Sequence, residues 1–238
     1  RVGALRHPFG PMAEKSRGSV GQSLAVPDDV PDALAAALGN AGLAAWLPLS
    51  WRARLQPGES VLVLGATGTS GLIAVAAARA LGAGRIVAVG RNPERLERAL
   101  AAGADAVVQL EDCEDLDARY QAALEGPADI VVDYLNGPPA MAALKVMATG
   151  GRMVQLSSTL SQSIEVPAML ARKHSLTVMG FAYYHAPRAD QEAAYAALCK
   201  AAVNNLIELD HAVTPLDSFK EAWQRQKEGS PVRQVIVP

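Results

Sequence analysis

The stretch VLVLGATGTSGLIAVAAARALGA, residues 61–83, decides the fold, because it joins a predicted strand to a predicted helix through a glycine-rich turn. Residues 61–64 form a short apolar run rich in β-branched side chains, which is typical of a buried strand. From Gly71 onward the apolar residues follow helical spacing and alanine dominates, which predicts a helix over 71–82. The turn between them, GATGTSG, has three glycines in seven positions, so its backbone can approach a ligand closely.

The chain beyond this turn keeps alternating between strand and helix patterns. Further strands are expected at 85–89, 106–109, 128–133, 152–156 and 175–181, with helices at 93–102, 114–125, 139–147 and 166–173. Gly150 and Gly151 are expected to end the helix at 139–147. Strands separated by helices of about ten residues favour right-handed βαβ units. The sequence therefore predicts the α/β class, with a Rossmann doubly wound sheet of six parallel strands.

The flanking segments differ from this alternation. Residues 1–30 contain PFGP and VPDDVP and predict loops and short strands. The following Ala- and Leu-rich stretch predicts a helix interrupted near Gly39–Asn40 and at Pro48. After the sheet, the sequence predicts helices at 190–205 and 219–229, and a closing strand in PVRQVIVP.

Composition excludes several classes of function. The 238 residues are 50% hydrophobic and 19% charged, which is ordinary for a folded protein. The net charge of −2, without a long basic run, argues against a nucleic-acid surface. No uninterrupted apolar run reaches the roughly 18 residues of a spanning helix, and no signal peptide opens the chain. A cytoplasmic protein that binds neither nucleic acid nor membrane is expected.

The chain offers few metal ligands. Cys113 and Cys199 are far apart and neither belongs to a CxxC pair, so both are expected to be reduced. The four histidines lack the short spacings of a zinc site; they are His7, His174, His185 and His211. No metal site is expected.

The glycine turn has the pattern of a dinucleotide-binding loop, Ala66-x-Gly68-x-x-Gly71. In such folds the first βα turn presents backbone N–H groups to a pyrophosphate. Gly68 would let the phosphates approach, and Gly71 would let the helix pack closely on the strand. Hydroxyl donors stand beside these glycines at Thr67, Thr69 and Ser70. A strand before the motif and a helix after it favour a dinucleotide; a glycine turn without a ligand, and a mononucleotide or S-adenosylmethionine site, are the alternatives.

The end of the second strand indicates which cofactor is preferred. NAD-selective sites usually carry a carboxylate about 20 residues beyond the glycine motif, but here the strand ends in Gly90-Arg91-Asn92. An arginine can bind a 2′-phosphate with a bidentate fork. We therefore expect NADPH, with Arg91 as the main phosphate ligand and Asn92 and Arg95 as helpers. The alternative is that Arg91 is an ordinary solvated surface residue.

At this point the chain resembles the medium-chain dehydrogenase/reductase superfamily, specifically its zinc-free quinone oxidoreductase branch. The most specific segment is LQPGESVLVLGATGTSGLIAVAAARALGAGRIVAVGRN, residues 55–92. The other segments that carry the resemblance, in chain order, are PFGPMAEKSRGSVGQSLAVPDDVPDALAAAL, GNAGLAAWLPL, VVDYLNG and GGRMVQLSS. The likeness runs from about residue 9 to the end of the chain. Most of the family's amino-terminal GroES-like catalytic domain has no counterpart here, which leaves open a fragment, a shortened member or missing residues.

The resemblance implies a division of the chain and a set of cofactor contacts. Residues 1–35 would be a remnant of the GroES-like catalytic domain, 36–210 the Rossmann NADPH-binding domain, and 211–238 a segment returning to the catalytic domain. The implied contacts are Thr67, Gly68, Thr69, Ser70 and Gly71 at the pyrophosphate; Gly90, Arg91 and Asn92 at the adenosine ribose; Leu135 and Asn136 at the adenine; Leu156, Ser157 and Ser158 at the nicotinamide ribose; and Phe181 and Ala182 at the nicotinamide ring. Asp133 and Tyr134 can equally be a strand-end carboxylate and a packing aromatic, and residues 183–185 (YYH) can line a substrate cavity or pack in the core.

The resemblance also implies an activity: metal-free hydride transfer from NADPH to a quinone or an α,β-unsaturated carbonyl, in which the cofactor carries the chemistry. No catalytic side chain is nominated. The alternative is a non-catalytic NADPH-binding sensor or partner-binding module. A short-chain reductase is excluded because Pro187 and Arg188, rather than lysine, follow Tyr183 and Tyr184 by four residues. A homodimer formed through the edge strand 175–181 is expected.

Overall fold

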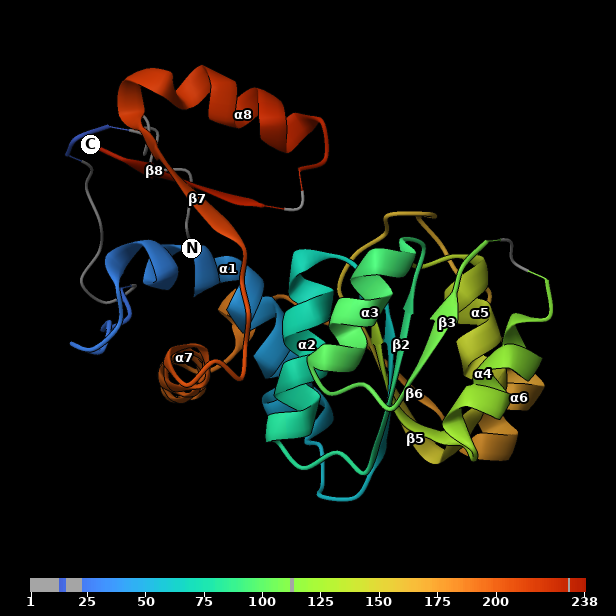
Figure 1. Cartoon of the computed structure of the whole chain (residues 1–238). Coiled ribbons are helices and arrows are strands. Elements are labelled where there is room, and N and C mark those ends of the chain that lie inside the picture. Colours follow the sequence, from blue (N-terminus) through green and yellow to red (C-terminus); the bar gives the residue numbers. More distant parts are fainter. Residues whose placement is uncertain (1–12, 16–22, 112–113, 231) are drawn as a thin grey trace.

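The six expected strands assemble into one parallel sheet with the order β3-β2-β1-β4-β5-β6 (Figure 1). Their bounds are β1 (Ser60–Leu64), β2 (Arg85–Gly90), β3 (Ala106–Gln109), β4 (Ala128–Asp133), β5 (Met147–Gln155) and β6 (Thr177–Gly180). This is the Rossmann strand order, and the predicted fold class is confirmed. The structure, a computed structural model, describes residues 13–15, 23–111, 114–230 and 232–238.

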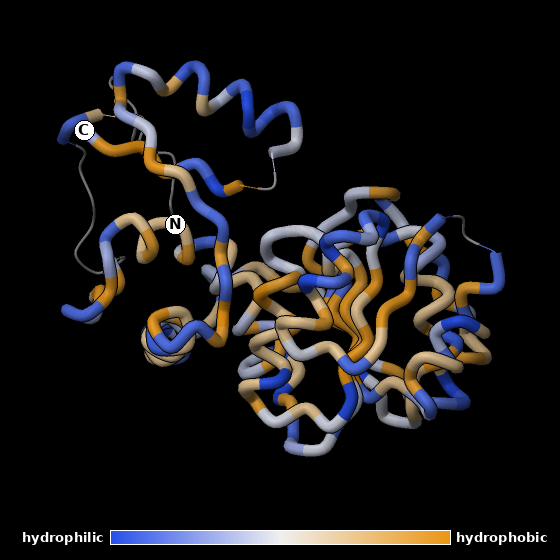
Figure 2. The backbone as a smooth tube through the Cα atoms, in the orientation of Figure 1, coloured by the Kyte–Doolittle hydropathy of each residue, from blue (hydrophilic) through white to orange (hydrophobic). Residues whose placement is uncertain are grey.

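Helices cover both faces of the sheet, because alternate residues of each strand point to opposite sides. On one face, Val61 and Val63 of β1 pack with α1, α2 and α7. α3 lies on this same face, against β2 and β3, and its Ala99 joins the same core. On the other face, Leu62 and Leu64 pack with α4 and α5, and α6 lies against β5. The bounds are α1 (Asp32–Leu47), α2 (Thr69–Ala80), α3 (Pro93–Ala101), α4 (Leu116–Leu124), α5 (Pro138–Lys145), α6 (Ala168–His174) and α7 (Arg188–Val203). Figure 2 shows the strands as an apolar layer between these helices.

The first helix is continuous where the sequence predicts an interruption. α1 runs through Gly39 and Asn40 without a break, so that prediction is wrong. Leu38 and Ala41, on either side of them, are buried in the core that α1 shares with α2 and α7. This burial outweighs the roughly 1 kcal/mol that a glycine costs inside a helix.

Pro48 does not end the helical path either, because η2 (Pro48–Ala53), a π-helical segment, follows α1 directly. Proline has no N–H, so the carbonyl of Ala44, four residues earlier, loses its helical partner. The Tyr134 hydroxyl donates a hydrogen bond to that carbonyl at 2.9 Å. The turn after β4 therefore supplies the donor that the proline removes.

The stretch Asp32–Ala53 has the length and apolar composition of a membrane-spanning helix. It contains 22 residues, and 61% of its most apolar window is buried inside the protein. Its contacts with α2 and α7 are those of a core helix in a globular protein. Among the described residues, this segment is therefore weak evidence for a membrane span.

β5 begins at Met147 rather than at residue 152, where the sequence predicts its start. Gly150 and Gly151 were expected to end a helix, but α5 ends at Lys145 and both glycines lie within β5. Met147 is buried and pairs with Ala128 at the start of β4. Gly150 has a φ of +78°, and a register shift follows this first pairing, so the strand bends before it joins the main ladder.

The C-terminal residues form a small unit of their own. β7 (His211–Pro215) and β8 (Arg233–Val237) pair in parallel, joined by η4 (Leu216–Ser218) and α8 (Phe219–Lys227). The sequence predicts α8 and β8 but not β7. Figure 1 shows this unit beside α1, outside the six-stranded sheet. The expected division at residues 35 and 210 stays a prediction; its first boundary falls inside α1.

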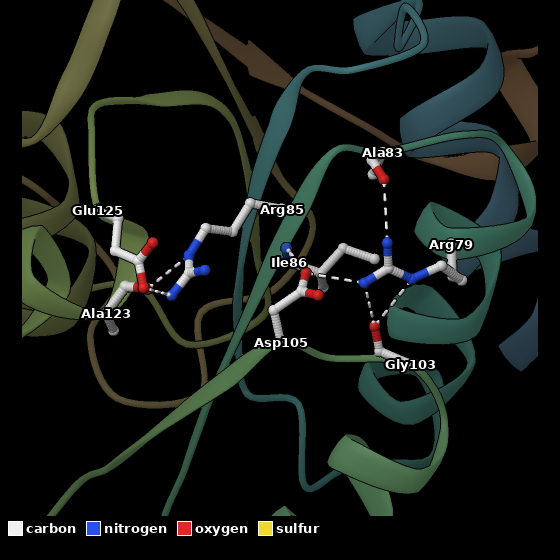
Figure 3. A network of polar contacts seen from close by, with 8 residues as sticks. All are labelled: Arg79, Ala83, Arg85, Ile86, Gly103, Asp105, Ala123 and Glu125. Atoms are coloured by element: carbon white, nitrogen blue, oxygen red, sulfur yellow. Dashed lines mark hydrogen bonds and ion pairs between the residues drawn. The ribbon is translucent and has the colours of Figure 1, made fainter.

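Polar contacts fasten the amino ends of β2 and β3 (Figure 3). Arg79 at the end of α2 pairs with Asp105 at 2.7 Å, and Asp105 also accepts the Ile86 N–H of β2 at 2.7 Å. Arg85 pairs with Glu125 at 2.6 Å, beyond α4. These bonds hold the amino ends of β2 and β3 to α2 and α4. In doubly wound folds a ligand is expected at the opposite, carboxyl-terminal edge of the sheet.

Candidate dinucleotide-binding site

A cavity of about 450 Å³ opens at the carboxyl ends of the strands, where the chain leaves β1 and β4 toward opposite faces. This is the switch point at which open α/β sheets bind ligands, and the volume is that of a small-molecule site. The predicted residues that line it are Gly68, Thr69, Ser70, Gly71, Leu156, Ser157, Phe181 and Ala182. The unpredicted ones are Asn40, Ala41, Ala44, Gly65, Tyr134, Thr159 and Arg233. Tyr183 also lines the cavity, which is one of the two alternatives that the sequence left open for residues 183–185.

The glycine loop forms one wall of the cavity. Gly65 has a φ of +90°, which lets the chain turn sharply after β1. A Cβ on Gly71 would lie 2.2 Å from the Gly65 carbonyl oxygen, so α2 can begin this close to the loop only with glycine there. A Cβ on Gly68 would meet no protein atom nearer than 3.4 Å, and the space beyond it is the cavity.

The first turn of α2 faces the same space. Thr69 and Ser70 line the cavity with their hydroxyl groups half-buried. The amides of the first helical residues have no carbonyl partner earlier in the helix, and the helix dipole adds positive potential there. This wall therefore offers hydrogen-bond donors to an anion.

Thr67 is placed differently from the other loop residues and does not line the cavity. A Cβ on Gly90, at the end of β2, would lie 2.3 Å from the Thr67 methyl carbon. The two residues therefore fit against each other, and the absence of a side chain at Gly90 lets the loop lie on β2.

The three polar residues after β2 have different surroundings. The Arg91 side chain is exposed and makes no hydrogen bond or ion pair with the described part of the chain. Asn92 caps α3, where its Oδ1 accepts the Arg95 N–H at 3.0 Å. Arg95 is half-buried beside the Arg98–Asp210 ion pair, its Nε has no hydrogen-bond partner, and burial lowers its pKa. Of these three side chains, only Arg91 is both exposed and unpaired within the described residues.

The turn after β4 is built on a buried carboxylate. Asp133 is fully buried, and its Oδ1 accepts the N–H groups of Leu135 and Asn136 at 2.8 and 2.9 Å. Burial raises the pKa of Asp133, although these two hydrogen bonds oppose the rise. The turn places the Leu135 side chain over Gly65, where a glycine Cβ would lie 3.2 Å from it. Leu135 and Asn136 thus flank the glycine loop without lining the cavity.

The loop after β5 forms the opposite wall. Leu156 and Ser157 line the cavity, whereas Ser158 does not. The Thr159 hydroxyl donates to the Tyr134 carbonyl at 2.9 Å, which ties this loop to the turn after β4. Burial also raises the pKa of the Tyr134 hydroxyl well above its ordinary value.

Aromatic residues close the far end of the cavity. Phe181 and Tyr183 line it together with Ala182, directly after β6. The Phe181 ring packs against Trp51, with centroids 6.2 Å apart. Tyr184 is exposed and packs edge-on against Tyr183 and His185, so only the first residue of the YYH segment reaches the cavity.

Arg233 is the site residue that sequence reasoning missed most completely. It lies on β8, where its backbone N–H donates to the Asp210 carbonyl at 2.8 Å, and it lines the same cavity as the glycine loop. No local pattern marks it, because its place depends on how the C-terminal unit folds back onto α1. Asn40 was missed because it was interpreted as a helix interruption.

The described residues contain no cluster of three or more His, Cys, Asp or Glu that could hold a metal ion. Cys199 is buried, and burial raises the pKa of its thiol. Cys113 lies outside the described residues. The cavity instead combines free helix amides, hydroxyl groups, a glycine cradle and an arginine, which together fit the pyrophosphate of a dinucleotide.

Strand order and the position of the cavity together define the Rossmann class of α/β folds. The sequence profile of a family described as "Zinc-binding dehydrogenase" matches residues 71–201, more than half of the chain. The chain therefore belongs to this family, within the medium-chain dehydrogenase/reductase superfamily, and the predicted resemblance is confirmed.

Known relatives agree with this placement. A mycocerosic acid synthase-like polyketide synthase of Mycobacterium tuberculosis is 34% identical over 131 residues, which are 55% of this chain and 6% of that protein. Quinone oxidoreductase-like protein 2 of Mus musculus is 29% identical over 155 residues, 65% of this chain and 44% of that protein. The chain thus spans less than half the length of these two relatives. The Escherichia coli quinone oxidoreductase, solved with NADPH, has a TM-score of 0.78 and 24% identity, covering 92% of this chain and 69% of that one.

Proposed function

We propose that this chain carries the NADPH-binding part of a metal-free, cytoplasmic oxidoreductase that transfers a hydride to a quinone or an α,β-unsaturated carbonyl. One observation carries the proposal: the glycine loop, the start of α2 and Arg233 face one cavity at the switch point of the sheet. Relatives named as quinone oxidoreductase-like support the choice of substrate class.

The residues of the cavity divide the binding task between them. Amides and hydroxyls of Thr69 and Ser70 would hold the pyrophosphate from one side, and the Arg233 guanidinium from the other. Arg91, exposed beyond β2, would bind the 2′-phosphate that distinguishes NADPH from NADH.

The other end of the cavity has the properties of a nicotinamide pocket. Leu156 and Phe181 give it an apolar wall. NADPH, when bound, supplies the hydride, and the walls fix the direction in which its ring faces the substrate. We also propose that groups from outside this chain, including a GroES-like domain, would contact the substrate.

Cofactor selectivity is the direct test. Arg91→Asp should weaken NADPH binding by at least about tenfold and leave NADH binding unchanged or improved, because a carboxylate repels the 2′-phosphate. Both cofactors are titrated against the chain by calorimetry. Arg172→Asp, at an exposed arginine on α6, is the matched control and should not alter either affinity. An unchanged preference in Arg91→Asp contradicts the assigned role of Arg91.

Turnover separates the enzyme from its alternative. The loss of NADPH absorbance is followed with a panel of quinones and 2-alkenals, for this chain and for a parent protein that includes the GroES-like domain. Turnover by the parent supports the proposal. NADPH binding without turnover by the parent supports instead a non-catalytic sensor or partner-binding module.

A further inference from the structure

A second cavity, of about 520 Å³, lies between η2 and the edge of the sheet. Its polar walls come from Trp51, Arg52, Arg54, Gln56, Arg152 and Thr177. It shares no lining residue with the dinucleotide cavity. The Trp51 ring, packed against Phe181, stands between the two, so this second cavity, which we name the arginine pocket, is a separate site.

The arginine pocket has more positive than negative charge. Arg152 pairs with Glu59 at 2.6 Å, and Glu59 also accepts the Gln56 N–H. Arg52 and Arg54 have no carboxylate partner in the described part of the chain. The pocket thus holds three arginines, and only Arg152 is paired with a carboxylate, that of Glu59.

The guanidinium groups also keep free donors. The Nε of Arg152 is buried and has no hydrogen-bond partner. Arg52 uses its Nε to donate to the Gly180 carbonyl at 3.2 Å, which fixes it at the end of β6 over the Trp51 ring. Arg54 makes no hydrogen bond through its side chain within the residues that the structure describes. Like charges placed together with unpaired donors indicate a missing anion.

From this geometry we infer that the arginine pocket binds a phosphate group of a small molecule. A phosphate ester carries a charge of about −1.5 to −2 at neutral pH, which matches the surplus of two positive charges. Its oxygens accept the paired N–H groups of a guanidinium fork. The proposal does not depend on the dinucleotide site, because no residue is common to both.

The test is a calorimetric titration of the chain with inorganic pyrophosphate and, in parallel, with citrate. Pyrophosphate should bind more tightly than citrate, and its affinity should fall as salt is added. Arg54→Asn is the first variant, because asparagine accepts the positive φ of +54° at this position. Arg52→Gln is the second variant and removes a different guanidinium. Circular dichroism and thermal melting show whether each variant is folded.

Two further variants serve as controls. Arg172→Gln changes an exposed arginine outside the pocket. Arg233→Gln changes the dinucleotide cavity, where pyrophosphate is also expected to bind, and so weakens that second contribution to the titration. A loss of at least about tenfold in pyrophosphate affinity when Arg54→Asn or Arg52→Gln is added to the Arg233→Gln chain, with Arg172→Gln having no effect in the same chain, supports the inference. It is overturned if pyrophosphate does not bind to the Arg233→Gln chain, if citrate binds to that chain equally well, or if both pocket substitutions, each added to it, leave the affinity unchanged.

Discussion

Asp133 shows how one buried residue organises the carboxyl edge of the sheet. Its Oδ1 holds two N–H groups of the turn that carries Leu135 over the glycine loop. Its Oδ2 and the Oδ1 of Asn136 are both buried without partners. Burial raises the pKa of Asp133 in the folded protein. The folded state therefore binds this proton more tightly than the unfolded chain does.

This difference gives the stability a pH dependence of known sign. The contribution of protonated Asp133 is fully present below the ordinary carboxyl pKa and is lost as the pH rises through the raised one. Asp133→Asn keeps an acceptor for the two amides and no longer ionises, so it should gain stability relative to wild type as the pH rises from about 4 toward neutral. Urea unfolding at a series of pH values measures this.

The matched control is Asp28→Asn, at an exposed aspartate. Its stability difference from wild type should not follow the same trend. Asp133→Ala removes the acceptor altogether and should cost about 1–3 kcal/mol, because two buried N–H groups lose their partner. Parallel pH curves for wild type and Asp133→Asn would show that Asp133 does not titrate as described.

At the scale of the elements, α3 begins at a residue with two assigned roles. Asn92 caps the helix and was also predicted to help bind the 2′-phosphate. Asn92→Ala should lower the free energy of unfolding by about 1 kcal/mol, because the Arg95 amide loses its acceptor. Asn92→Asp retains the cap and should retain the stability, yet its carboxylate should weaken NADPH binding. Equal NADPH affinity in both variants would remove Asn92 from the cofactor site.

The elements also show what the sequence could predict. The bounds of β1 and β4 were predicted to within one residue. Short apolar runs bounded by turn residues are typical of buried strands and fit few other structures. The break expected in α1 and the late start expected for β5 were wrong at Gly39 and Gly150. In both places a local glycine signal was overridden by burial: Leu38 against α2 and α7, and Met147 against β4.

At the scale of the whole molecule, the site joins parts that no local pattern connects. The glycine loop was predictable, since strand, loop and helix are consecutive. Arg233 reaches the same cavity from the far end of the chain, and Asn40 from the helix before the sheet. Their approach depends on the packing of α1 against β7 and β8, which is a tertiary property.

The outer edge of the six-stranded sheet affects the assembly of the whole molecule. β6 ends the strand order, Val178 is 40% exposed on it, and no residue of the neighbouring α6 is buried. An exposed edge strand of this kind pairs readily with a second copy across a two-fold axis. We expect a homodimer at micromolar concentration, measured by sedimentation. Val178→Lys should give monomers that unfold as wild type does, while Val213→Lys, at an exposed valine of β7, should leave the dimer intact. A wild-type chain that sediments as a monomer at this concentration would refute pairing through β6.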